Sequence, residues 1–311
     1  GVILFKQQKL ALAKIEFLKS INLDKSFIDP YKNLFKLNLR SQDYESAIKN
    51  AEKTLELDNQ KNPISYFNLA LAYDLNKDYK KAIELYKTVE TLNFKEKKIL
   101  FNNLAKCFLS AQNIDQAKNY YLKALEYDQN DKLILNNLLI LFLRIGDKNK
   151  AEYFYKKAKE IDKNYIEFQL NESDYLISKD KIEDAIKCLK TIIDNSKNYI
   201  AYTKLSKIYS MIGNFKKSIE VIEEAIITFP NKKDLKFTRG IHHLIEGEFE
   251  KGWEFYELRD SIIKDNLYEN LKTWKGENLK DSTIVVTSEQ GMGDIIQFSK
   301  FLINLSSLCK K

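Results

Sequence analysis

The chain has 311 residues, of which 44% are hydrophobic and 31% are charged, and its formal net charge is +7. Only nine Gly and three Pro are present, which favours a mostly helical protein. No run of about 18 apolar residues occurs, so we expect no membrane span. Lysines alternate with Asp and Glu along the expected helix faces, whereas nucleic-acid-binding proteins gather cations on one side, so we expect no nucleic-acid partner.

The three cysteines, Cys107, Cys188 and Cys309, stand far apart within apolar helical patterns. An odd number without a CxxC motif favours free thiols in a reducing compartment over disulfides or a zinc site. No secretory leader is recognisable at the start of the chain. We therefore expect a cytoplasmic protein without a bound metal.

Residues 66–93 define the unit from which most of the chain is built. Tyr66, Leu69, Ala70 and Tyr73 recur at helical spacing, and a second set with the same spacing follows a turn at 76–78. Two such helices form a hairpin whose apolar faces cannot be buried without neighbours. The unit is therefore expected to stack on copies of itself.

One small residue marks each copy at the point where the two helices cross. It recurs at steps of 33 to 35 residues as Ala13, Ala47, Ala82, Ala117, Ala151, Ala185, Ser218 and Gly252. A larger side chain would push the helix axes apart. This pattern resembles the tetratricopeptide repeat over roughly residues 1–260, which implies an all-α superhelix, or α-solenoid, that binds protein or peptide in its concave groove.

The repeats divide the chain as follows. We expect a partial repeat at 1–27, six repeats at 28–231, a capping repeat-like hairpin at 232–260, a linker at 261–280 and the start of another domain at 281–311. The chain begins with Gly1, and its first clear helix around 11–21 looks like the second half of a repeat, which indicates an N-terminus cut inside a repeat.

An asparagine recurs at one register of five successive first helices, as Asn33, Asn68, Asn103, Asn137 and Asn171, and Lys204 follows in the sixth. An amide both donates and accepts hydrogen bonds, so this column is suited to hold a peptide backbone. It resembles the asparagine ladder of the O-linked N-acetylglucosamine transferase family. The alternative, equally weighted, is that these residues seat neighbouring hairpins, as Asn does in ordinary tetratricopeptide repeats.

Other first-helix residues are expected to line the groove and to set side-chain preference: Phe67, Leu71, Lys106, Ile140 and Arg144. The fifth hairpin departs from the pattern, with Gln169 and Glu172 at core positions and Lys181 at the turn, so we expect it to be looser or displaced. Of the two adjacent histidines, His242 and His243, we expect one beside Trp253 and the other on the surface.

The end of the chain carries a second resemblance. The residues Gly252-Trp253, Tyr256-Glu257, Arg259, 274–277 (WKGE) and 289–298 (EQGMGDIIQF) resemble the junction between bacterial tetratricopeptide repeats and a heptosyltransferase-like glycosyltransferase domain of GT-B type. The resemblance implies a nucleotide-sugar donor for the full-length family. No cofactor is expected in this chain itself, because only the first strand and helix of such a domain are present and it should not catalyse glycosyl transfer.

The pattern of that segment predicts a strand at 283–287 and a helix at 295–305, joined by a glycine-rich turn. Gly291 and Gly293 allow close approach of a phosphate or sugar, and the helix N-terminus favours an anion. By resemblance, Asp294 is the candidate base that activates the acceptor hydroxyl. An N-cap role for Asp294 is the favoured alternative.

The sequence therefore predicts a module that binds extended polypeptide and presents it to a glycosyltransferase domain incomplete in this chain. The alternative is a tetratricopeptide scaffold or assembly protein without sugar chemistry.

Overall fold

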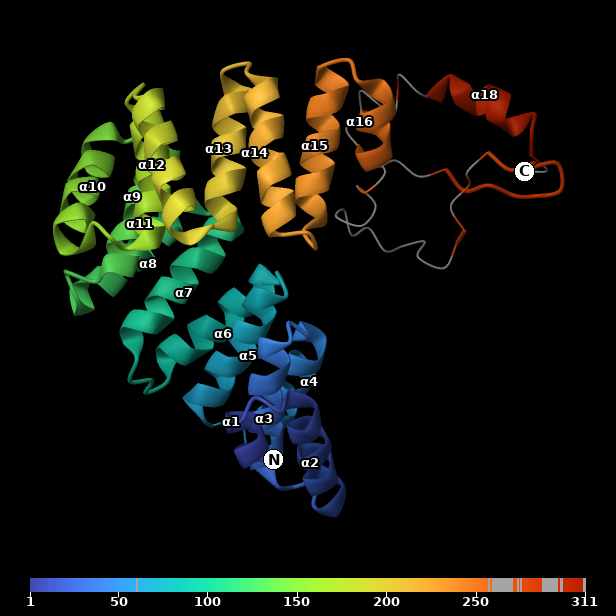
Figure 1. Cartoon of the computed structure of the whole chain (residues 1–311). Helices are drawn as coiled ribbons and strands as arrows, with labels where there is room; N and C mark the ends of the chain where they lie inside the picture. The colour runs from blue at the N-terminus through green and yellow to red at the C-terminus, as the bar shows by residue number, and fades with distance from the viewer. Residues whose placement is uncertain are drawn as a thin grey trace. The chain divides into compact units, whose positions relative to one another are not determined.

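The computed structural model describes residues 1–59, 61–256, 258, 271–272, 274, 276–286, 296 and 299–309. The chain divides into two compact units, Gly1–Leu258 and Arg259–Lys311. The first unit is a succession of helical hairpins, which Figure 1 follows from α1 in blue to α16 in orange.

The helices of the first unit are, in chain order, α1 (Val2–Lys6), α2 (Leu10–Leu23), α3 (Ile28–Arg40), α4 (Tyr44–Leu57), α5 (Pro63–Leu75), α6 (Tyr79–Thr91), α7 (Lys97–Ser110), α8 (Ile114–Tyr127), α9 (Lys132–Ile145), α10 (Lys148–Asp162), α11 (Ile166–Ser178), α12 (Ile182–Ser196), α13 (Tyr199–Met211), α14 (Phe215–Thr228), α15 (Lys233–Ile245) and α16 (Phe249–Tyr256). Odd-numbered helices are the first helices of the hairpins, and even-numbered helices are the second. The predicted all-helical solenoid is confirmed.

Two residues at most of the turns explain why the hairpins form where they do. The residue that ends the turn caps the second helix, as when the Asp43 carboxylate accepts from the backbone N–H of Ser46 and the Asn113 side chain accepts from that of Gln116. The preceding residue takes a left-handed conformation, with φ of 59° at Gln42 and 60° at Gln112. This backbone conformation turns the chain out of the first helix.

The register of small residues places the helix crossings as predicted. The Ala and Ser members are at most 1% exposed, and Gly252 is buried. The two helices of the last hairpin lie close together, because a Cβ on Gly252 would stand 2.5 Å from Leu244 Cδ2 and one on Gly240 would stand 2.9 Å from Gly252 O. Glycine at both positions therefore lets α15 and α16 approach more closely than alanine would allow.

Each second helix packs on the first helix of the next hairpin, so the apolar core runs along the solenoid. One buried cluster extends from Ala70 to Tyr175 and another from Leu170 to Leu235. The two clusters meet on α11 of the fifth hairpin. There the Glu172 carboxylate, at a core position in the sequence pattern, accepts from Tyr155 Oη at 2.6 Å and Lys159 Nζ at 2.9 Å.

The predicted strand at 283–287 is wrong for the part that the structure describes, because residues 282–286 form no strand. A β-strand is stabilised by hydrogen bonds to a neighbouring strand, and none of the described residues forms one. The predicted helix at 295–305 corresponds in part to α18 (Phe301–Ser306).

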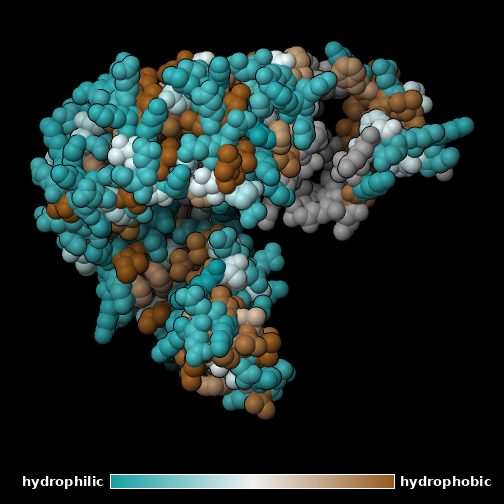
Figure 2. Space-filling view, viewed as in Figure 1, coloured by the Kyte–Doolittle hydropathy of each residue, from teal (hydrophilic) through white to brown (hydrophobic). Residues whose placement is uncertain are grey.

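Polar side chains cover most of the face seen in Figure 2, with smaller apolar patches among them. The N-terminal end is an exception, where Leu12, Ile15 and Leu18 of α2 are each about half exposed. None of the described helices is both long and apolar enough to cross a bilayer.

Candidate functional site

The candidate site is the first-helix face, defined here as the surface formed by side chains of α3, α5, α7, α9, α11, α13 and α15. The five asparagines of the predicted column are all half-buried on this face. Their hydrogen bonds, however, divide them into different groups. Asn33 Nδ2 donates to Asp29 O of its own helix at 2.9 Å and joins no neighbour.

Two asparagines connect neighbouring hairpins. Asn103 Nδ2 donates to Tyr86 Oη of the preceding hairpin at 3.3 Å, and Asn137 Nδ2 donates to Asn102 Oδ1 at 2.9 Å. These contacts are those expected if the column seats hairpins on one another. They favour the structural interpretation for these two residues.

The other two asparagines, Asn68 and Asn171, make no side-chain hydrogen bond to any residue that the structure describes. Asn136 is the counterpart of Asn102 in the following repeat, and its buried Oδ1 has no partner among the described residues. If the hairpins repeated exactly alike, Asn171 would donate to Asn136. That bond is missing at α11, where the two core clusters meet, so Asn171 retains its full hydrogen-bonding capacity.

The predicted lining residues lie on this face in different environments. Phe67 is half-buried and stacks on Phe94 with ring centroids 4.9 Å apart, which places it in the seam between hairpins. Lys106 and Arg144 are exposed. Near Lys106, burial raises the pKa of the half-buried Asp74 carboxyl, against the opposing effects of a hydrogen bond to Cys107 and the charge of Lys106.

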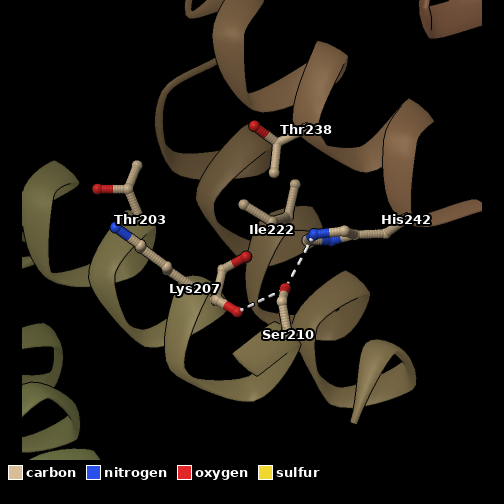
Figure 3. A pocket seen from close by; sticks show the side chains of 7 residues that line it. Thr203, Lys207, Ser210, Ile222, Thr238 and His242 are labelled. Atoms are coloured by element: carbon tan, nitrogen blue, oxygen red, sulfur yellow. Dashed lines mark hydrogen bonds between the residues drawn. The ribbon is translucent and has the colours of Figure 1, made fainter. Parts of the chain in front are cut away.

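A pocket of about 330 Å³ opens between α13 and α15 and is backed by α14. Its lining consists of Thr203, Ser206, Lys207, Ser210, Ile222, Thr238 and His242. Figure 3 shows Thr203 and Lys207 on one side of this space and His242 on the other, with Ile222 between them. We refer to it as the α13–α15 pocket.

Serine hydroxyls hold the His242 ring at both nitrogens. Nε2 lies 2.9 Å from Ser210 Oγ, and Nδ1 lies 3.1 Å from Ser218 Oγ. Ser218 Oγ is in turn 2.7 Å from Ser206 Oγ. Burial, and to a smaller extent the charge of His243, lower the pKa of His242. The ring is therefore fixed in place and neutral at pH 7.

This arrangement corrects the expectation for the histidines. Both are buried, at 6% and 7% exposed, so the expectation of one histidine on the surface is wrong. His242 packs against serines of the preceding hairpin, and His243 Nδ1 lies 2.7 Å from Glu248 Oε2. The pattern missed this because the partners of His242 are 24 and 32 residues away.

A second pocket of about 340 Å³ adjoins the first, between α11 and α13. It includes Asp174, Lys204 and Met211, and it shares Lys207 with the α13–α15 pocket. Lys204 Nζ, at the register of the asparagine column, is paired with Asp174 Oδ2 at 2.6 Å. Lys207 is not among the residues predicted for the site, although it stands one helical turn after Lys204 in the sequence.

The residues predicted for sugar chemistry, Gly291, Gly293 and Asp294, lie outside the described residues, and their roles stay predictions. Within the described part of the chain, no group of three His, Cys, Asp or Glu side chains could hold a metal ion.

Family models agree with the repeat register. Two tetratricopeptide repeat models match residues 102–166 and 199–226, and a model for the anaphase-promoting complex, cyclosome, subunit 3 matches residues 40–124. The solenoid is built of tetratricopeptide repeats. Repeats of this kind support a role as a protein-interaction scaffold.

Solved tetratricopeptide structures resemble the chain in fold. A tetratricopeptide repeat protein from Parabacteroides merdae has a TM-score of 0.61 at 17% identity, over 76% of this chain and 94% of that one. The Cut9–Hcn1 hetero-tetramer of the anaphase-promoting complex gives 0.58 at 16% identity, over 75% and 46%. PilF of Pseudomonas aeruginosa gives 0.54 at 17% identity, over 66% and 92%.

The Sol locus transcriptional repressor of Clostridium acetobutylicum is 38% identical over 91 residues. The match covers 29% of this chain and 28% of the repressor, so it compares less than a third of either protein. These comparisons identify the tetratricopeptide fold and leave the ligand open.

Proposed function

We propose that the chain binds an extended polypeptide along its first-helix face. The observation that carries this proposal is the pair of adjoining pockets lined mainly by side chains of α11, α13 and α15. Both lie on first helices of successive hairpins, so one extended chain that runs across the hairpins would pass both.

Hydrogen-bonding groups along the same face support an extended ligand. The free amides of Asn68 and Asn171 each offer a donor and an acceptor, which matches the alternating C=O and N–H groups of a peptide backbone. Such contacts bind a backbone whatever its side chains are. The exposed Lys106 and Arg144 and the half-buried Leu71 and Ile140 would then select acidic and aliphatic side chains.

Selection from a phage-displayed library of random peptides of about 12 residues, followed by fluorescence anisotropy, tests the proposal. We expect binders whose affinity falls in an Asn68→Ala/Asn171→Ala variant with unchanged melting temperature. The matched control is Lys190→Ala, an exposed position on the second helix α12. If binders keep their affinity for the Asn68→Ala/Asn171→Ala variant and lose it for Lys190→Ala, the ligand does not lie on the first-helix face.

A narrower form of the proposal is that the polypeptide is presented to a glycosyltransferase domain. Its support is the sequence resemblance within residues 252–298, and Asp294 would be the base in the complete enzyme, with a nucleotide-sugar as donor. Sequencing the gene beyond codon 311 tests this form. A continuing α/β pattern with a second glycine-rich strand-to-helix turn supports it, and its absence favours the scaffold without sugar chemistry.

A further inference from the structure

Six of the seven residues that line the α13–α15 pocket carry a hydrogen-bonding group. Hydroxyls of Thr203, Ser206, Ser210 and Thr238 line it together with the Lys207 ammonium and the His242 ring, and Ile222 is its one apolar lining residue. These hydrogen-bonding groups give the pocket the means to hold a polar group of a ligand.

The charge at the pocket is positive. Lys207 has no carboxylate within 4.0 Å among the described residues, whereas Lys204, three residues earlier, is neutralised by Asp174. His242 adds no charge at pH 7, because its burial favours the neutral ring. An unpaired ammonium beside hydroxyl donors attracts an oxyanion.

The walls of the pocket are held in place before any ligand arrives. Ser206 is 1% exposed and His242 is 6% exposed, and the contacts of Ser210 and Ser218 fix both ring nitrogens. Thr203 Oγ1 and Thr238 Oγ1 donate to carbonyls of their own helices at 2.9 Å and 2.8 Å. Rotation about χ1 would turn either hydroxyl away from its helix and free it to donate to a ligand.

The size of the pocket limits its occupant. A volume of about 330 Å³ is near the lower end of the range of about 300–1,000 Å³ for ligand pockets. It has room for the charged end of a side chain.

We propose that the α13–α15 pocket binds an oxyanion, a phosphate or a carboxylate, carried on a side chain of the bound polypeptide, with Lys207 as its counter-ion and Thr203 and Thr238 as hydrogen-bond donors. The peptide part rests on the proposed function. The anion site itself is independent of it and is tested with free anions.

The chain has only two histidines, so the Cε1–H signal of His242 is a convenient NMR probe of this pocket. Inorganic phosphate and, separately, acetate are titrated into the full chain at constant ionic strength. We expect phosphate to move the His242 signal saturably in the wild type and in Lys190→Ala, and to bind at least about tenfold more weakly in Lys207→Ala. The His243 signal and the far-UV circular dichroism show that each variant is folded.

The acetate arm separates the two sources of the oxyanion. A saturable shift with both anions assigns the pocket to carboxylates as well as phosphates, and a shift with phosphate alone assigns it to a phosphorylated side chain. No saturable shift in the wild type, or an equal shift in Lys207→Ala, would overturn the anion site. A loss in Lys190→Ala equal to that in Lys207→Ala would also overturn it, because it would show general attraction to surface charge.

Peptides then connect the pocket to the proposed function. A selected binder is then scanned one position at a time. At each position, four versions of the peptide carry alanine, aspartate, glutamate or phosphoserine. At one position we expect an anionic form to bind about tenfold more tightly than alanine in the wild type and equally in Lys207→Ala. If no peptide binds but phosphate does, the proposed function fails and the anion site stands. If peptides bind and phosphate does not, the anion site fails and the proposed function stands.

Discussion

Asn137 Nδ2 donates to Asn102 Oδ1 at 2.9 Å, so a carboxamide on one first helix is held by the first helix of the preceding hairpin. Asn137 belongs to the column that sequence alone connects equally with peptide binding and with hairpin packing. The hydrogen bonds of the column therefore differ from one repeat to the next. Asn103 and Asn137 connect hairpins, while Asn68 and Asn171 remain available to a ligand.

This division predicts opposite effects for two pairs of substitutions. Asn103→Ala/Asn137→Ala should lower the free energy of unfolding by about 1–3 kcal/mol, because Asn102 Oδ1 is left buried without a donor. Asn68→Ala/Asn171→Ala should leave the melting temperature nearly unchanged and weaken binding of a selected peptide by about 0.5–1.5 kcal/mol per lost bond. Thermal unfolding and anisotropy titrations measure both quantities, and equal melting temperatures for the two variants would contradict the division.

Left-handed residues in the hairpin turns predict a stabilising substitution. Gln112 has φ of 60° without being glycine, a conformation that costs a side-chain-bearing residue about 1–2 kcal/mol. Gln112→Gly should raise the free energy of unfolding by about 0.5–1 kcal/mol after the greater entropy of glycine in the unfolded chain is included. Gln112→Ala is the control, since alanine keeps the unfavourable φ. A melting temperature that falls in Gln112→Gly would count against this account of the turn.

The close crossing of α15 and α16 predicts a destabilising substitution. In Gly252→Ala the new methyl group would meet Leu244 Cδ2 at 2.5 Å and the Leu244 backbone nitrogen at 2.9 Å, so one helix must move. We expect a loss of about 1–3 kcal/mol in urea unfolding. The opposite change at the same register, Ala185→Gly, creates no clash; it adds the flexibility of glycine, at about 1 kcal/mol, and removes one buried methyl group, at about 0.8 kcal/mol. Tolerance of Gly252→Ala would show that the two helices have room to separate.

His242 predicts a dependence of stability on pH. Its folded-state pKa is lowered, so as the pH falls below the unfolded value of about 6.5 the unfolded chain binds a proton that the folded chain resists. This contribution to stability is present above about pH 6.5 and is lost as the pH falls toward the folded pKa. Melting temperatures of the wild type should decrease between about pH 7.5 and about pH 5.5, and His242→Gln should show a smaller decrease. Identical slopes in the two proteins would contradict this role of His242.

Sequence periodicity was sufficient for the features that depend on local spacing. The small residues from Ala13 to Gly252 predict the helix crossings because each lies at a fixed distance from its own turn. Asp43 and Asn113 each stand four positions before one of these small residues, and each is the N-cap of a second helix. These features need only one hairpin, and a single hairpin is contained in about 34 consecutive residues.

The candidate pocket could not be predicted in the same way. Ser218 stands in the register of small residues, so its small size is sufficient reason for a serine there. Nothing in the sequence pattern indicates its contact with His242. The pocket also joins side chains from α13, α14 and α15, and their approach depends on how two hairpins pack. The strand expected at 283–287 failed for a related reason, because a β-branched run such as 283–286 becomes a strand only beside a partner strand.

The central claim is that a polypeptide lies along the first-helix face. Photo-cross-linking tests it most directly, with a benzophenone group placed in turn at Lys106 and Lys207 on first helices and at Lys190 and Lys216 on second helices, all exposed positions. With a selected peptide, the account predicts cross-links from Lys106 or Lys207 that excess unlabelled peptide suppresses, and none from Lys190 or Lys216. Suppressible cross-links confined to Lys190 or Lys216 would contradict it.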